Sequence, residues 1–394
     1  MAKIMVVAGG AWQCPIVKTA KEMGHTVICT NLYENSPAFE FADLGVVANV
    51  LDKNKNLDIA KEHKPDAVLT EQTDIAVPTV AYVAEKLGLK GIGTDVAERF
   101  TNKYKMREYA FKAGIPVPKY KLCYTQDEAA AFLLTTPVCV IKPIDSQSSR
   151  GIHVVRSKDD IEKNFDDCIQ YSHAEKAILI EEYIEGTEFT VDGVKTSNEY
   201  VVTAISEKKH YDYNPNVAKE LRFTQTNPSY DYDKLRAENA KLISAMGLPF
   251  GLTHTEYKYH EGTFYLIETA ARGGGTKISS DITKLVFGID CGKLLIKMLL
   301  GESDEIVREN HHECAILGFF DFKPGLIKEI VGVEEAKNLD GVQDLKLEVS
   351  VGDMLGEAQD DRSRCGYYIL YADSDEQLNE RERLLKDTVR VITE

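Results

Sequence analysis

The segment Ile178-Leu-Ile-Glu-Glu-Tyr-Ile-Glu-Gly-Thr-Glu188 gives the clearest indication of the fold. Its first residues form an apolar run typical of a buried strand, and the acidic stretch with a glycine that follows ends the strand in a short connector. Apolar and polar residues then alternate over residues 189–194, 200–205 and 252–257, as expected for strands with one covered face. The segment therefore predicts the junction between a small α+β module and a second, mainly antiparallel sheet.

Two acidic residues close neighbouring strands of this second sheet. Glu256 ends one strand, the turn signal Glu261-Gly262 follows, and Glu268 ends the next strand. Antiparallel pairing can bring both carboxylates onto one face. Carboxylate oxygens several ångström apart suit magnesium ions that bridge phosphate oxygens. Arg272 and three glycines follow directly.

Two lysines precede these acids in the chain. Lys103, in Thr-Asn-Lys-Tyr-Lys-Met, and Lys142, at the end of the apolar run Val-Ile-Lys-Pro, supply compact positive charges. Small polar residues fill the loop after Lys142, and their hydroxyl and backbone N–H groups can close over phosphates. The loop includes Ser148, Ser149 and Gly151. Alone, each lysine is more often solvated and the loop is an ordinary connector, but with the two acids they indicate a site for ATP and metal ions between two sheets.

The opening segment offers further contacts to a nucleotide. A strand that runs into Glu181 and then into a short connector can present backbone N–H and C=O groups to the edge of an adenine. Glu188 lies where a carboxylate can accept hydrogen bonds from ribose hydroxyls. The alternative interpretation is an acidic edge connector without a ligand. The residues that we expect beside the adenine are Glu181, Glu182, Tyr183 and Ile184.

The N-terminal part predicts a parallel sheet covered by helices. An apolar run over residues 3–9 ends in two glycines, and a helix-like segment over 14–23 leads to a second apolar run. Strand-like pieces at 44–50 and 67–69 continue a Rossmann-like alternation of strand and helix. The stretch Gly114-Ile-Pro-Val-Pro118 then interrupts a helix and indicates a hinge.

The ordered set of lysines, acids and arginine resembles the ATP-grasp superfamily, which includes D-alanine–D-alanine ligase, biotin carboxylase, purine-pathway carboxylases and formyltransferases, and L-amino-acid ligases. The resemblance covers nearly the whole chain and implies a fold of mixed α/β and α+β class. Its expected parts are a Rossmann-like pre-ATP-grasp domain over residues 1–98, a linker helix and hinge over 99–119, a lid over 120–184, an antiparallel-sheet catalytic core over 185–305 and a small C-terminal α+β region over 306–394.

The resemblance also implies roles for individual residues. Lys103 and Lys142 correspond to the two lysines on the ATP phosphates. Glu181 and Ile184 flank the adenine contacts, and Glu188 corresponds to the acid that binds the ribose. Glu256 and Glu268 correspond to the ligands of the metal, which is Mg²⁺ with Mn²⁺ as an alternative. Arg272 corresponds to the arginine that steadies the acyl phosphate or the substrate carboxylate.

Two features of the family pattern leave a choice open. A third basic contact falls to Lys219 or Arg222, with Lys219 slightly favoured. Alanine stands at position 270, where many members have an asparagine two residues after the second metal-binding acid. This departure, which some purine-pathway members resemble, bears on the number of metal ions more than on the use of ATP.

The activity that the resemblance implies is an ATP-dependent ligase. It activates a carboxylate as an acyl phosphate, joins it to an amine, and releases ADP and phosphate. The segment from Cys314 through Ile327 resembles the C-terminal region of L-amino-acid ligases and favours an amino acid as one substrate. A purine-pathway-like carboxylase or formyltransferase and an ATP-grasp kinase are the alternatives. A nicotinamide enzyme is disfavoured because the second strand ends at Thr30-Asn31 without the ribose-binding acid, and the glycines lack G-x-G-x-x-G spacing.

The charge composition disfavours two classes of binding partner. The chain has 63 acidic and 47 basic side chains and a net charge of -16, which opposes binding to nucleic acid or to an anionic membrane. The first apolar run is too short for a signal peptide, so we expect a cytoplasmic protein. The eight cysteines show no C-x-x-C pair and are expected to be reduced thiols. We expect a homodimer that acts on a small carboxylate and a small amine.

Overall fold

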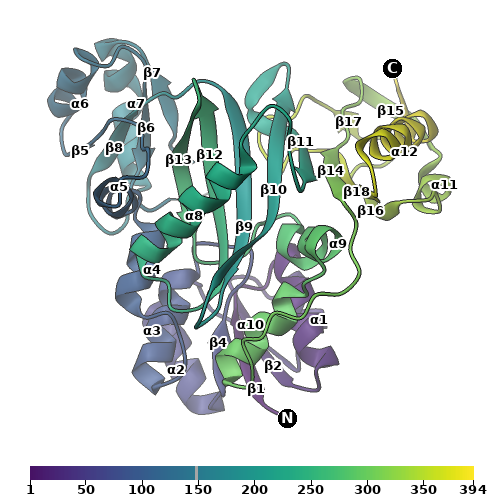
Figure 1. Ribbon diagram of the computed structural model, residues 1–394, viewed down its shortest axis with the longest axis horizontal. Coiled ribbons are helices and arrows are strands. Elements are labelled where there is room, and N and C mark those ends of the chain that lie inside the picture. The colour runs from purple at the N-terminus through teal and green to yellow at the C-terminus, as the bar shows by residue number, and fades with distance from the viewer. Residues whose placement is uncertain (147–149) are drawn as a thin grey trace.

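The computed structural model describes residues 1–146 and 150–394, and the strands of these residues form four sheets. In Figure 1 the N-terminal sheet lies at the bottom, a small sheet lies at the upper left, an eight-stranded sheet occupies the centre and the C-terminal region lies at the right. The predicted mixture of a parallel N-terminal sheet with antiparallel sheets is confirmed. The domain boundaries given above remain predictions.

The N-terminal sheet is parallel throughout and has the strand order β3-β2-β1-β4. Burial of the inner residues of β1 and β2 explains the apolar runs at residues 4–7 and 27–29. The loops after β1 and β4 leave the carboxyl edge of this sheet, where ligands of open α/β sheets bind. The strands are β1 (Lys3–Val7), β2 (Thr26–Asn31), β3 (Leu44–Val47) and β4 (Ala67–Leu69), and the helices are α1 (Cys14–Glu22), α2 (Lys53–His63) and α3 (Val77–Leu87).

The small sheet is antiparallel, in the order β5-β8-β6-β7. Capping boxes at Thr125 and Ser157 begin its two helices, which cover one face. Its elements are β5 (Tyr120–Cys123), α6 (Gln126–Leu133), β6 (Cys139–Pro143), β7 (His153–Val155), α7 (Lys158–Gln170) and β8 (Ile178–Glu182). Ser148 and Ser149, predicted to contact phosphates, lie outside the described residues.

The eight-stranded sheet forms the centre of the molecule, in the order β13-β12-β9-β10-β11-β14-β18-β16. One face of β9, β12 and β13 carries Phe189, Tyr257 and Phe264, which pack with α5 (Lys103–Lys112), α4 (Thr94–Thr101) and α8 (Tyr232–Met246). The opposite face is polar around Glu188 and Glu256, the part called the polar face below, and apolar at Val194 and Leu252. The first five strands are β9 (Thr187–Lys195), β10 (Tyr200–Tyr211), β11 (Asn214–Thr224), β12 (Gly251–His260) and β13 (Thr263–Ala270).

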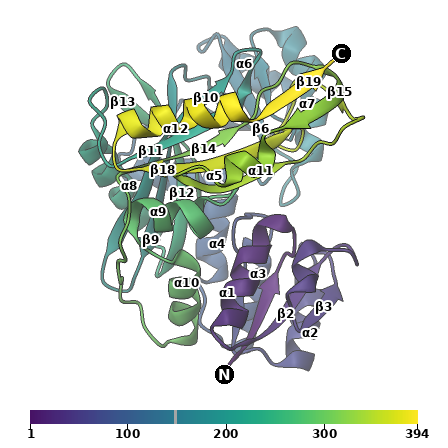
Figure 2. The same cartoon turned by 90° about the vertical axis from the view of Figure 1, so that its right-hand side faces the viewer.

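The C-terminal region extends this sheet through β14 (Cys314–Phe319), β18 (Gly366–Ala372) and β16 (Val342–Leu347), with β14 paired to β11. Helix α12 (Asp375–Thr388) covers β14 and β18 (Figure 2). The remaining elements are α9 (Thr283–Phe287), α10 (Cys291–Leu300), β15 (Gly325–Val331), α11 (Val333–Lys337), β17 (Met354–Leu355) and β19 (Arg390–Thr393).

One apolar core joins the N-terminal sheet to the central sheet. Helix α10 contributes Leu294 and Met298, which share a buried cluster with Val17 of α1 and Leu252 of β12. This packing fixes the carboxyl edge of the N-terminal sheet beside the polar face of the central sheet. No helix among the described residues is long and apolar enough to cross a membrane. All eight cysteines are free.

Candidate active site

Charged side chains gather on the polar face of the central sheet. Glu256 on β12 is the direct register partner of Glu268 on β13, because the register shifts between Glu256 and Tyr257. Glu188 on β9 is the register partner of Lys208 on β10. Directly opposed residues point to the same face of an antiparallel pair, so adjoining strands display all four groups together.

Lys208 lies between two of the acids. Its Nζ contacts Glu188 Oε1 and lies 2.6 Å from Glu256 Oε1. Burial opposes ionisation of Glu188, but Lys208 and a hydrogen bond from His210 outweigh burial and lower the pKa of Glu188 to about 2. The same lysine outweighs burial at Glu256 and holds the pKa of that carboxyl well below its ordinary value. The two carboxylates are therefore ionised at neutral pH.

Lys103 faces the other metal-ligand candidate. Asn102 caps α5, and Lys103 is the first residue of that helix. Lys103 Nζ lies 2.6 Å from Glu268 Oε1 and donates to the carbonyl oxygen of Ser146 at 2.7 Å. The ammonium group thus joins the central sheet to the loop that follows β6, at the place where the predicted phosphate-binding loop begins.

Lys142 and Glu181 form part of a buried ion cluster. Lys142 Nζ lies 2.6 Å from Glu181 Oε2, and Arg107 of α5 contacts the same carboxylate. Arg107 Nη2 also donates to the carbonyl oxygen of Ile267 at 2.6 Å. Burial opposes ionisation of Glu181, but Arg107 and Lys142 lower its pKa to about 2. The Glu181 side chain therefore orients Lys142, while α5 links the small sheet to the central sheet.

The Arg107–Glu181 pair leads to a prediction about stability. We expect Arg107→Ala to lower the free energy of unfolding by about 3 kcal/mol at pH 7, because a buried carboxylate loses its main partner. Folding lowers the Glu181 pKa from 4.5 to about 2, so the stabilisation is complete above about pH 4.5 and is lost as the pH falls toward 2. Urea unfolding at a series of pH values should therefore show the deficit of the variant shrinking over this range. Lys119→Ala, which removes an exposed contact to Glu182, is the control; an equal effect of both variants would contradict the prediction.

The other predicted nucleotide contacts lie at the end of β8 and beyond. Ile184 is buried, and Glu182 and Tyr183 are partly buried. The amides of Glu182 and Tyr183 donate to the carbonyl oxygens of Lys119 and Val138. Gly151 has a φ of +69°, and a Cβ there would lie 2.7 Å from the Tyr171 ring. Both the positive φ and the lack of space for a Cβ atom therefore favour glycine at position 151.

Arg272 lies where the central sheet meets the loop after β4. Its Nε and Nη2 atoms donate to Asp74 Oδ1 at 3.0 Å and Oδ2 at 2.8 Å. Burial opposes ionisation of Asp74, but Arg272 outweighs it and lowers the pKa of Asp74. Nearby, Glu71 accepts from the Gly273 amide at 2.9 Å and from Ser279 Oγ at 2.7 Å. Burial raises the pKa of Glu71.

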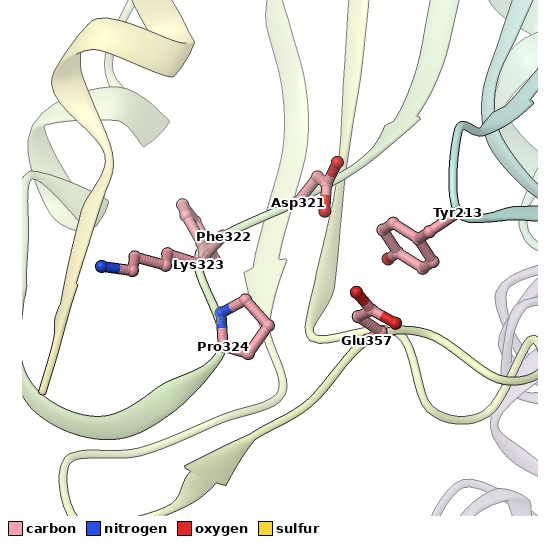
Figure 3. Close-up of a pocket in the computed structure, with 6 residues that line it drawn as sticks. All are labelled: Tyr213, Asp321, Phe322, Lys323, Pro324 and Glu357. Carbon is pink, nitrogen blue, oxygen red and sulfur yellow. The ribbon is translucent and has the colours of Figure 1, made fainter.

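The two candidates for a third basic contact lie elsewhere. Lys219 Nζ lies 2.8 Å from Asp321 Oδ2, and Arg222 contacts Asp375 and Asn379 near the start of α12. Asp321 also lines a hollow of about 280 Å³ at the tip of the β10–β11 hairpin (Figure 3). The hollow shares no residue with the polar face described above. Lys208 is the basic residue that the structure brings to Glu188 and Glu256.

The carboxylates of this site fit a metal ion that is also coordinated by a bound phosphate compound. Within residues 1–146 and 150–394, no group of three or more His, Cys, Asp and Glu side chains is arranged to bind a metal ion. Two facing carboxylates, Glu256 and Glu268, match the way Mg²⁺ binds through one or two protein carboxylates plus phosphate oxygens and water. They do not match a cage made of protein ligands alone.

Six charged residues of this site were not predicted from the sequence: Glu71, Asp74, Arg107, Asp192, Lys208 and His254. Arg107 could have been found from the sequence, because it lies one helical turn after Lys103 on the same face of α5. The others lie in loops or on strands whose partners are distant in sequence.

Two family models match the chain. Residues 135–281 match an ATP-grasp domain, and residues 318–394 match the L-amino acid ligase C-terminal domain 2. Alanine–anticapsin ligase of Bacillus subtilis (strain 168) is 29% identical over 272 residues, which are 61% of this chain and 55% of that protein. A formate-dependent phosphoribosylglycinamide formyltransferase of Erythrobacter litoralis (strain HTCC2594) is 29% identical over 188 residues, 47% of this chain and 48% of that protein. The chain spans about half the length of these curated relatives.

The fold is also that of known structures. The crystal structure of L-amino acid ligase from Bacillus licheniformis aligns with a TM-score of 0.80 and 21% identity, covering 100% of this chain and 99% of that one. At this identity the likeness concerns the fold. It includes the N-terminal sheet and the C-terminal region as well as the central sheet, because the alignment spans both chains.

Proposed function

Because this chain is an ATP-grasp protein that ends in an L-amino acid ligase C-terminal domain, we propose that it is an ATP-dependent carboxylate–amine ligase with an amino acid as one substrate. ATP and Mg²⁺ are its proposed cosubstrate and cofactor. The proposal includes the cytoplasm as its compartment and a homodimer as its assembly. The small sheet and its helices act as a lid over the nucleotide.

One observation carries the proposal: the facing carboxylates Glu256 and Glu268 are each paired with a lysine, Lys208 and Lys103. A site that binds a metal–triphosphate complex needs both anionic ligands for the cation and cationic groups for the phosphates. Arg272 stands at the end of the same hairpin, beside the carboxyl edge of the N-terminal sheet. A second substrate in that crevice would lie next to the phosphates.

The reaction follows from this arrangement. A substrate carboxylate oxygen attacks the γ-phosphorus, the bond to ADP breaks, and the acyl phosphate forms. The nitrogen of the amine then attacks the acyl carbon, the bond to phosphate breaks, and the nitrogen releases a proton to water as the amide forms. Glu256 and Glu268 would hold Mg²⁺, which neutralises charge on the phosphates when bound. The lysines and Arg272 bind the remaining anionic oxygens, and closure of the lid keeps water from the acyl phosphate.

A comparison of basic residues tests the assignment of the third phosphate contact. We expect Lys208→Met to weaken binding of Mg-ATP by about 10- to 100-fold, since a hydrogen bond from a charged group contributes about 1.5–3 kcal/mol. Lys219→Met and Arg222→Met should bind as the wild type does, because their partners are Asp321 and Asp375. Isothermal titration with a non-hydrolysable ATP analogue measures all three. Weak binding by Lys219→Met with normal binding by Lys208→Met would reverse the assignment.

The proposed activity is tested by a screen of carboxylates against amines with the purified protein. ADP and phosphate are measured separately. Ligation releases both, whereas an ATP-grasp kinase releases ADP and leaves the phosphate on its product. The purine-pathway alternative is supported by the formyltransferase relative, so formate with an amine-bearing ribotide belongs in the screen. ADP formation without any dependence on a carboxylate would exclude the ligase.

A further inference from the structure

The strand that carries Glu256 also carries a buried histidine that the proposed mechanism does not use. His254 is 8% exposed, and its register partner on β9 is Asp192, which is 2% exposed. His254 Nδ1 lies 3.1 Å from Asp192 Oδ1, and Nε2 lies 3.8 Å from Glu256 Oε1. Burial of charged groups is costly unless each is paired. The imidazole of His254 lies between Glu256, one of the two proposed metal ligands, and the buried Asp192.

Asp192 connects this histidine to the glycine loop. Its Oδ1 atom accepts a hydrogen bond from the Gly274 amide at 2.9 Å. A Cβ at position 274 would lie 2.5 Å from the same oxygen, so the loop can approach this closely only with glycine. Gly274 follows Arg272 by two residues. Asp192 therefore fixes the backbone that carries the arginine.

These contacts form one chain across the sheet. Glu256 lies beside His254, and His254 is hydrogen-bonded to Asp192. Asp192 in turn accepts a hydrogen bond from the backbone amide of Gly274, close to Arg272. Two groups proposed to act on the same phosphoryl and acyl centre, Glu256 and Arg272, are thus linked by buried side chains that the proposed mechanism does not use. A small displacement between such groups is costly, because catalysis depends on alignment of the reacting atoms.

We propose that His254 and Asp192 are positioning residues, which hold the Arg272 loop in a fixed place relative to Glu256. The effect on turnover rests on the proposed function, whereas the effect on the loop does not. Partners that orient ligating or catalytic groups typically contribute about 10- to 100-fold to affinity or activity. Asp192→Ala should therefore lower kcat by about this factor and raise the KM of the carboxylate or amine. The Kd of Mg²⁺ with a non-hydrolysable ATP analogue should change by no more than about twofold.

The experiment compares Asp192→Ala, His254→Ala and His254→Gln with a control, Tyr257→Phe. The control removes a buried hydrogen bond to Asn239 from the opposite face of the same strand. Hydrogen exchange in peptides covering residues 271–282 should be faster in Asp192→Ala and His254→Ala than in the control. His254→Gln should restore part of the protection and part of kcat, because the amide can still donate to Asp192.

The outcomes separate this inference from the proposed function. A purely structural role predicts a lower thermal midpoint for the His254 and Asp192 variants, with kcat and loop exchange like those of Tyr257→Phe, and would overturn the inference. Unchanged exchange in the loop of Asp192→Ala would overturn it as well. If the wild type ligates nothing, the proposed function fails. Faster exchange in the loop peptides would then still support the positioning contacts.

Discussion

Replacing Glu256 or Glu268 with glutamine is expected to reduce ADP formation by about 100- to 1,000-fold, the usual cost of losing one preorganised electrostatic contact to a transition state. Each substitution keeps the size of the side chain and removes one negative charge from the facing pair. The carboxylates are where a phosphate-bound Mg²⁺ would find its protein ligands. Initial rates in a coupled ADP assay, across a range of Mg²⁺ concentrations, measure the effect.

The metal dependence is the sharper readout of this prediction. Loss of a ligand should raise the Mg²⁺ concentration needed for half-maximal rate, and Mn²⁺ should restore part of the rate. Glu261→Gln is the matched control, because Glu261 lies in the exposed turn between the same two strands. Full activity of Glu256→Gln and Glu268→Gln, or an equal loss in Glu261→Gln, would remove these residues from the site.

The sequence predicts the hairpin that carries this pair because the information is local. The two strands are consecutive and a glycine turn joins them. Strict alternation from that turn would pair Glu256 with Ile267 and point Glu268 to the other face, whereas a register shift between Glu256 and Tyr257 places the two acids opposite each other. The N-terminal β-α-β pattern is predictable for a similar reason, since its first two strands contain bounded apolar runs. The pairing of β11 with β14 is not predictable in this way, because nothing in either strand identifies a partner so far along the chain.

The choice of a third basic contact cannot be made from local sequence alone. Lys208 is followed by Lys209 and His210, and three adjacent basic residues do not reveal which one faces the site. The pairing of β10 with β11 has register shifts at Lys209/His210 and His210/Tyr211. A bulge breaks the period of two, so the facing of Lys219 on β11 cannot be inferred by counting along the strands.

Glu181 shows a contact that the sequence did not predict. Its place at the end of an apolar strand predicts the border of a nucleotide site, and in the structure its side chain is paired with Arg107 and Lys142. Burial decides this, because a carboxylate that is 1% exposed requires compensating charge. The sequence gives the strand and the acid, whereas the ion cluster depends on how α5 packs between two sheets.

Arg272→Ala is expected to lose product formation by on the order of 100-fold or more while Mg-ATP binding stays within about twofold of the wild type. The guanidinium holds both oxygens of Asp74, and the same two-pronged geometry suits a substrate carboxylate or an acyl phosphate. Arg272→Lys keeps the charge but offers no planar fork, so it should recover little activity. Arg362→Ala, which changes an arginine side chain that is 88% exposed, is the control.

The release of phosphate relative to ADP, and the trapping of the activated acid, show which step Arg272 serves. In the wild type, phosphate should appear in step with ADP only when the carboxylate and the amine are both present, and hydroxylamine should capture the activated acid as a hydroxamate. In Arg272→Ala the hydroxamate should disappear together with the product, because the arginine acts on the activated acid rather than on the nucleotide. A variant that still forms hydroxamate but no amide would move Arg272 to the amine side of the site. A stable phosphorylated product without free phosphate would make the protein a kinase, and reduction of added NAD would exclude the ATP-dependent reaction altogether.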